Sequence, residues 1–204
     1  MCSWGLVGLV TLLAVLVWAG ERFGGPRLSV YDWFPLLGLL PFSLMWTHYI
    51  IGSLRRYLGV GKEINRQYTK LTSIAVLVFI LLHPGLLNFQ LNRDGLGLPP
   101  SSYQAVYPQA MQGAITLGAI GLLIFLAFEF KRWFGKKSWW RFMEYAQIVA
   151  MGLIFYHGLT LGRELSVGWY RAVWYGYGVS LVAAIVYNYR YDSRVKRRSV
   201  HAEE

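Results

Sequence analysis

Cysteine is nearly absent from this sequence, because Cys2 is the single cysteine among its 204 residues. One thiol excludes an intramolecular disulfide, a thiolate metal cage, covalent CxxCH heme attachment and an iron–sulfur cluster. Any metal or cofactor must therefore be held by other side chains.

Charge is also scarce. Charged residues make up 15% of the chain and hydrophobic residues 55%, whereas about a quarter of a soluble domain is charged. The composition therefore predicts an integral membrane protein. A net charge of +10 would suggest nucleic acid as a partner of a soluble protein, but the positions of the basic residues give another explanation.

Six apolar runs are each long enough to cross a hydrocarbon core of about 30 Å. They lie near 3–19, 33–53, 71–91, 109–130, 142–162 and 170–190. The sequence therefore predicts an all-α fold, a bundle of six transmembrane helices that forms one domain over residues 1–204. Membrane lipid is then the first partner of the chain.

The basic residues gather in three of the connections between these runs. The segments after the second, fourth and sixth runs hold fifteen of the twenty Lys and Arg residues. Because basic segments stay in the cytoplasm, this asymmetry predicts that both termini are cytoplasmic. It also accounts for the net charge without nucleic acid.

Two segments outside the central runs need an interpretation. The first run resembles a signal peptide in its small residues "VWAG", but its start, "MCSWG", lacks the positive charge of such a leader, so we expect a retained helix. The long loop "NRDGLGLPPSSYQAVYPQ" is rich in Gly, Pro, Asn and Ser, which predicts irregular structure.

Three histidines fall within the apolar runs: His48, His83 and His157. Ionisable groups at membrane depth usually face the bundle interior or a partner. Counted from the cytoplasmic boundary, His83 and His157 lie roughly 18 and 22 Å along their helices. Two neutral imidazoles at similar depth on different helices can hold a heme iron from both sides. Alternatively, each ring is a hydrogen-bonding group between helices.

Other residues near this pair fit a heme. Arg93 and Arg163 follow the two histidines at the outer surface, where they could pair with heme propionates or be ordinary boundary arginines. Small residues in the fourth and fifth runs leave room for a porphyrin or for close helix packing; they are Gly113, Gly118, Gly121, Gly152 and Gly158.

The segments "RQYTKLTSIAVLVFILLH" and "WWRFMEYAQIVAMGLIFYH" resemble the ferric reductase-like transmembrane domain. That six-helix core is shared by ferric reductases, NADPH oxidases and the heme-binding membrane subunit of the bacterial methionine-sulfoxide reductase system. The resemblance is closest to the last of these, a stand-alone subunit of the bacterial inner membrane. It implies that His83 and His157 are the axial ligands of the outer b-type heme.

The sequence departs from the family pattern at the inner heme. Many members carry further histidines thirteen or fourteen residues earlier, where this chain has Thr69 or Lys70 on one helix and Met143 or Glu144 on the other. We therefore expect one heme b. A second heme would have to recruit His48, with Met143 as its partner; otherwise His48 makes a packed polar contact or a hydrogen bond near a quinone.

The resemblance implies a membrane b-type cytochrome, the electron-transfer subunit of an oxidoreductase. No Gly-rich dinucleotide fingerprint is present, so we expect electrons from a quinol or a separate cytoplasmic flavin reductase. The acceptor is then a redox protein or a metal on the outer face. Two alternatives stay open: a cofactor-free accessory membrane subunit, and a proton-coupled transporter that uses His48, Glu144 and His157.

Overall fold

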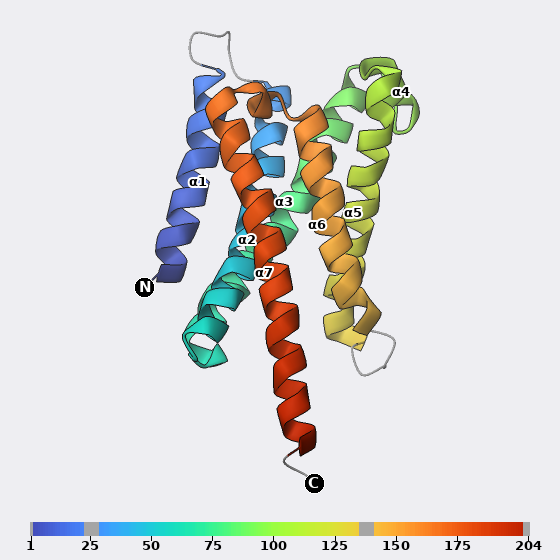
Figure 1. Ribbon diagram of the computed structural model, residues 1–204. Coiled ribbons are helices and arrows are strands. Elements are labelled where there is room, and N and C mark those ends of the chain that lie inside the picture. The colour runs from blue at the N-terminus through green and yellow to red at the C-terminus, as the bar shows by residue number, and fades with distance from the viewer. Residues whose placement is uncertain (1, 23–28, 135–140, 202–204) are drawn as a thin grey trace.

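The computed structural model describes residues 2–22, 29–134 and 141–201. All regular structure in these ranges is helical (Figure 1). Two short 3₁₀ helices are also present: Lys62–Asn65 lies just before α3, and Arg163–Ser166 lies just before α7. The α-helices are α1 (Cys2–Gly20), α2 (Val30–Tyr57), α3 (Arg66–Arg93), α4 (Ser101–Val106), α5 (Gln109–Phe134), α6 (Arg141–Leu161) and α7 (Gly168–His201).

Each of the six apolar runs corresponds to one long helix, so the all-α prediction is confirmed for the described residues. Within the described residues, four helical segments are long and apolar enough to cross a membrane: Ser3–Gly20, Val30–Tyr57, Glu63–Arg93 and Gln109–Glu129. Helix α7 is rich in tyrosine and basic residues. The chain thus has the character of a multi-pass membrane protein, and the count of six spans stays a prediction.

Successive long helices run in opposite directions (Figure 1). As a result, the first residues of α1 and the last residues of α7 both point toward the lower side of the view. This arrangement agrees with termini on one side of a membrane, although which side is cytoplasmic stays a prediction. Part of the second basic segment, including Lys136 and Lys137, lies outside the described residues.

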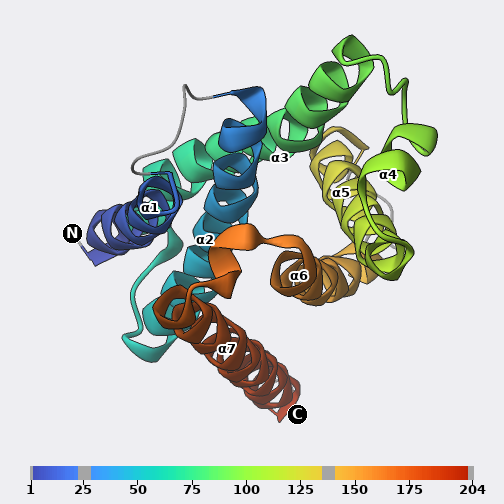
Figure 2. The ribbon, with the colours of Figure 1, turned by 90° about the horizontal axis from the view of Figure 1, so that it is seen from above.

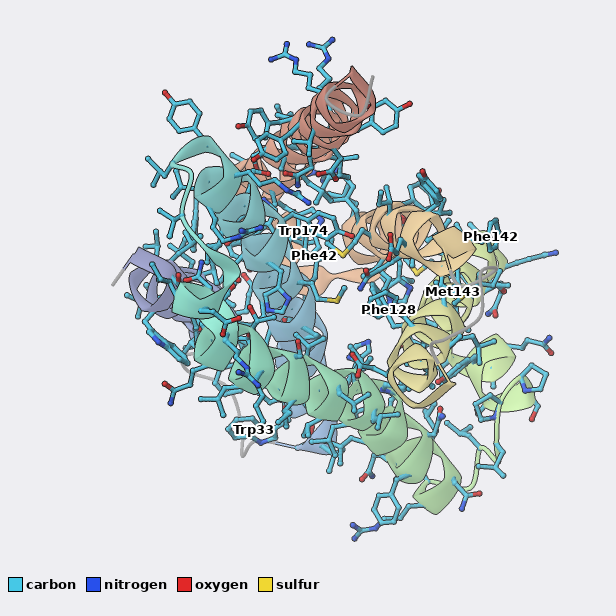
Figure 3. All side chains as sticks on the ribbon, turned by 90° about the horizontal axis from the view of Figure 1, so that it is seen from below. Trp33, Phe42, Phe128, Phe142, Met143 and Trp174 are labelled. Carbon is cyan, nitrogen blue, oxygen red and sulfur yellow. The ribbon has the colours of Figure 1, made fainter. Side chains whose placement is uncertain are left out.

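Helix α2 occupies the centre of the molecule (Figure 2) and packs against α1, α3 and α7. Of its apolar window 61% is buried, against 17% for α1, α3 and α5, so the rest of the protein covers those three helices far less than it covers α2. The core between α2 and α7 is aromatic. Phe42 stacks on Trp174 with ring centroids 4.4 Å apart, and both lie near the centre in Figure 3.

Helices α5 and α6 form a second unit beside this core (Figure 2). They pack closely on each other, and α6 also contacts α2. Gly121 of α5 permits the close approach, because a Cβ there would lie 2.8 Å from Cγ1 of Ile154 on α6. The molecule therefore contains two antiparallel helix pairs, α2–α3 and α5–α6, which meet through α2 and α6.

The loop between α3 and α5 is more ordered than its composition predicts. The expectation of wholly irregular structure is wrong, because Ser101–Val106 forms α4 at the upper end of the molecule. Long-range hydrogen bonds fix this segment. The Tyr103 hydroxyl donates to the side-chain oxygen of Asn88 on α3, and the Gln112 amide of α5 donates to the Tyr103 carbonyl at 3.0 Å. The amino-acid composition of the loop carries no information about these partners on α3 and α5.

Candidate functional site

The structure brings His83 and His157 together. His83 lies on α3 and His157 on α6, and their ring centroids are 6.4 Å apart with an angle of 83° between the ring planes. Both side chains are partly buried. The two rings come from different helix pairs, so their meeting depends on how the α2–α3 and α5–α6 pairs pack together.

Each ring is held by the other helix of its own pair. Nδ1 of His83 lies 2.7 Å from the carbonyl oxygen of Phe34 on α2. Nδ1 of His157 lies 2.8 Å from the carbonyl oxygen of Ala114 on α5. A carbonyl oxygen only accepts hydrogen bonds, so in the neutral imidazole Nδ1 carries the proton and Nε2 carries the lone pair.

A glycine stands four residues after each of these carbonyls. In a helix, side chains lean toward the N-terminus, so the side chain at i+4 covers the carbonyl at i. Gly38 leaves the Phe34 carbonyl uncovered, and Gly118 does the same for Ala114. The rings fill the space that results. A Cβ at Gly38 would lie 2.8 Å from Cε1 of His83, and one at Gly118 would lie 2.6 Å from Cε1 of His157.

These observations fit a metal that is held by two imidazoles. Metal-binding histidines usually donate their second ring N–H to a carbonyl or a carboxylate, which fixes the tautomer and the ring orientation. A metal bound to Nε2 of both rings, with bonds of about 2 Å, would hold the ring centres roughly 6 Å apart. The observed separation is close to that value.

The surroundings of the rings restrict the kind of metal group. No group of three His, Cys, Asp or Glu side chains that could hold a metal ion occurs among residues 2–22, 29–134 and 141–201. Two histidines alone form an incomplete site for a bare ion. A porphyrin supplies four equatorial nitrogens of its own, so the donor set fits a bis-histidine heme.

The sequence left two uses open for the glycines of α5 and α6, room for a porphyrin and close helix packing. The space at Gly118 is taken by the His157 ring, that at Gly121 by Ile154, and that at Gly158 by Trp174. No atom lies within 4 Å of a Cβ at Gly113 or Gly152, apart from those of the helix itself and the adjoining residues. Close packing therefore accounts for three of the five glycines.

The two arginines at the upper end differ in their contacts. Arg163 begins the 3₁₀ helix after α6, and its Nε lies 3.3 Å from a carboxylate oxygen of Glu21. Arg93 is the exposed last residue of α3. Arg93 ends the helix of His83, and Arg163 follows the helix of His157. The contact with Glu21 competes with any propionate for the Arg163 side chain.

His48 and Met143 lie on different helix pairs. His48 of α2 faces α3, where its Nε2 lies 2.6 Å from the Thr72 hydroxyl and its ring meets Tyr68 edge-on. Met143 is buried near the start of α6, on the side of the molecule where α5 and Phe128 lie (Figure 3). The hydrogen bond to Thr72 is the packed polar contact that the sequence left open for His48.

Sequence reasoning missed Phe34, Gly38 and Ala114. The patterns "FPLLG" and "AITLG" place a glycine four residues after the carbonyl that is used, but such patterns are common in membrane helices. They become informative once the neighbouring helix is known. No family model, curated protein or solved structure matches the chain.

Proposed function

We propose that this protein is a membrane b-type cytochrome that holds one heme between His83 and His157. The observation that carries the proposal is the ring pair itself, with centroids 6.4 Å apart and each Nδ1 at hydrogen-bond distance from a backbone carbonyl. The resemblance of both histidine segments to the ferric reductase-like transmembrane domain points to the same group.

In the proposed site, the histidines and the two backbone carbonyls have different roles. His83 and His157 would hold the heme iron through Nε2, and the carbonyls of Phe34 and Ala114 would orient the two rings and raise their basicity. When bound, a heme supplies reversible one-electron chemistry at its iron. An iron held by both imidazoles would have no open position for oxygen or substrate, which would favour outer-sphere electron transfer.

The donor and the acceptor are the ones that the sequence and its family resemblance lead us to expect. We propose a quinol or a separate cytoplasmic flavin reductase as donor, and a redox protein or metal on the outer face as acceptor. In this account the chain is the electron-transfer subunit of an oxidoreductase in a bacterial inner membrane, and a second heme at His48 and Met143 is not expected. Since His48 already contacts Thr72 across α2 and α3, a ligand role would require that contact to break.

A second candidate, a cofactor-free accessory subunit, is favoured by one observation. Both rings already make a hydrogen bond within their own helix pair, which is sufficient to explain a histidine that only joins two helices. The two candidates differ in what they require of the rings. A cytochrome needs both Nε2 atoms at one metal, and an accessory subunit needs only the Nδ1 contacts.

A visible spectrum and a heme assay separate the two candidates. The purified protein, produced in heme-supplied cells, should show sharp b-type bands in a reduced-minus-oxidised spectrum and one heme per chain by pyridine hemochrome. His83→Gly and His157→Gly should each lose the heme, and added imidazole should restore part of it. His48→Ala is the matched control and should keep one heme. Full heme in either glycine variant, or no bands in the wild type, would refute the proposal.

A further inference from the structure

A second polar cluster lies between α2 and α3, apart from the two histidines of the proposed heme site. It is made of Thr47 and His48 on α2 and of Tyr68 and Thr72 on α3. Thr47, Tyr68 and Thr72 are buried, at 0%, 3% and 4% exposure, whereas His48 is partly exposed. His48 is therefore the member of the cluster that a ligand can reach from outside.

The hydrogen bonds of the cluster show which nitrogen of His48 carries the proton. Thr72 Oγ1 donates to the carbonyl oxygen of Tyr68 at 2.8 Å, and a hydroxyl has a single proton to donate. The imidazole is therefore the donor in the contact of 2.6 Å between Nε2 of His48 and Thr72 Oγ1. In the neutral ring the lone pair is then on Nδ1, which is the opposite arrangement to that of His83 and His157.

The hydroxyl groups of the cluster are satisfied within the helix pair. Thr47 Oγ1 donates to the carbonyl oxygen of Leu44 at 2.6 Å, so the Tyr68 hydroxyl donates to Thr47. Together with the bond from Thr72 to the Tyr68 carbonyl, this uses all three hydroxyl protons. None of them is left to pair with Nδ1 of His48.

Nδ1 of His48 is accessible from outside the helix pair. In the ranges that the structure describes, the ring makes a hydrogen bond through Nε2 and none through Nδ1. A buried nitrogen without a partner would belong with the five buried, unpartnered side-chain atoms of these ranges, and Nδ1 of His48 is not among them. The ring therefore presents a hydrogen-bond acceptor at the surface of α2 and α3.

His48 lies on the side of the heme ligands that is predicted to be cytoplasmic. Helix α2 runs from the upper to the lower side of Figure 1, and His48 follows Gly38, the neighbour of the His83 ring, by ten residues. On α3, Thr72 precedes His83 by eleven residues. With the rise of an α-helix, both helices place His48 roughly 15 Å from the His83 ring. The acceptor is thus separate from the proposed heme ligands but belongs to the same helix pair.

We propose that His48 binds the headgroup of a membrane quinol, and that it binds the reduced quinol in preference to the oxidised quinone. The choice of ligand rests on the proposed function, in which a quinol is one of the two candidate donors. A quinol hydroxyl can donate to Nδ1, whereas a quinone has only carbonyl oxygens, which accept. The N–H of the ring is already engaged by Thr72, so it does not compensate for a quinone.

This preference agrees with the direction of electron transfer. Oxidation of one quinol removes two electrons, which the outer-face acceptor of the proposed function receives, and two protons, which pass to water. The resulting quinone has lost the hydroxyl groups that donate to His48. The product is therefore held more weakly than the substrate and makes way for the next quinol.

Calorimetric titration with a short-tailed quinol tests the site. The heme-loaded protein in lipid nanodiscs is titrated under anaerobic, reducing conditions, so that the quinol is not consumed. The dimethyl ether of the same quinol, which has no O–H, should bind about tenfold more weakly, as should the quinone when it is titrated into the oxidised protein. Equal affinity for the quinol and its ether would overturn the proposal.

Variants of His48 locate the binding. His48→Ala should reduce the affinity for the quinol to that for the ether and leave one heme per chain. His48→Asn keeps an acceptor oxygen near the position of Nδ1 and should retain most of the affinity, which separates loss of the acceptor from loss of packing. Ser53→Ala is the matched control, because Ser53 contacts α7 from the lower half of α2. Unchanged affinity for the quinol in His48→Ala would overturn the proposal.

The heme-free variant His83→Gly separates this proposal from the cytochrome. It should bind the quinol as the wild type does, because His48 lies roughly 15 Å away. A wild-type protein that lacks heme but binds the quinol through His48 would refute the cytochrome and support the quinol site. A heme-loaded protein that does not distinguish the quinol from its ether would refute the quinol site alone.

Discussion

The α2–α3 and α5–α6 pairs hold their histidines by the same contact but lie in different surroundings. In both, a ring on one helix fills the space beside a glycine of the other helix and contacts the carbonyl four residues earlier. Helix α2 is enclosed by α1, α3 and α7, whereas α5 packs mainly on α6 (Figure 2). Two helices are therefore sufficient to orient one histidine ring, and the packing of the two pairs brings the two rings together.

The largest difference between the pairs should appear when the glycines are enlarged. Gly118→Ala should reduce heme retention more than Gly38→Ala, because its Cβ would come closer to the ring, at 2.6 Å from Cε1 against 2.8 Å. Overpacking of this kind costs about 1–3 kcal/mol, roughly a tenfold to hundredfold loss in affinity. Heme content at limiting heme supply, with the optical spectrum, measures the effect.

Gly113→Ala is the matched control for α5, and Gly52→Ala for α2, because no atom lies within 4 Å of a Cβ at either position apart from those of the helix itself and the adjoining residues. Both should retain heme as the wild type does. Equal retention in Gly118→Ala and Gly113→Ala would show that the glycine contact does not position the ring.

Removal of the heme should loosen the α5–α6 pair more than the α2–α3 pair. A group bound across both histidines adds its binding free energy to the contact between the pairs, and α5 and α6 have fewer other neighbours. Hydrogen exchange, measured on the heme-loaded and the heme-free protein, should show that removal of the heme raises the amide exchange rates of α6 more than those of α2. Equal changes in both helices would mean that the pairs are joined by packing alone.

A smaller effect is expected at the second histidine of the α2–α3 pair. His48→Ala removes the hydrogen bond to Thr72, and such interhelical bonds in membrane proteins contribute about 1 kcal/mol. The variant should unfold more easily in a denaturant titration and keep its heme. Thr72→Val tests the same bond from the other side. A loss of heme in His48→Ala alone would assign His48 to a ligand role.

The smallest effects should come from the two arginines, Arg93 at the end of α3 and Arg163 just after α6. The exposed pair between Arg163 and Glu21 contributes less than about 1 kcal/mol. Arg163→Ala and Arg93→Ala should each lower the heme midpoint potential, because loss of a nearby positive charge favours the oxidised iron. Redox titration measures this, and an unchanged potential in both variants would separate the arginines from the propionates. A larger change for Arg93 would agree with the competing contact of Arg163.

The sequence correctly predicted those helices whose formation depends only on residues close to one another along the chain. The apolar runs near 71–91 and 109–130 correspond to α3 (Arg66–Arg93) and α5 (Gln109–Phe134), because a helix satisfies its own backbone within lipid and needs length more than a partner. Helix α4 was missed for the opposite reason. Its position depends on Asn88 and on α5, which composition within the loop does not reveal.

The sequence by itself determined that the chain is apolar and helical, and it placed His83 and His157 at similar heights on two helices. The tertiary structure decided which carbonyl and which glycine meet each ring. Phe34 and His83 are 49 residues apart along the chain, and Ala114 and His157 are 43 residues apart. It also placed Glu164 against Arg22, 142 residues away. Such contacts depend on how the side-chain surfaces of two helices fit together. The apolar periodicity of one helix gives no information about the surface of the other helix.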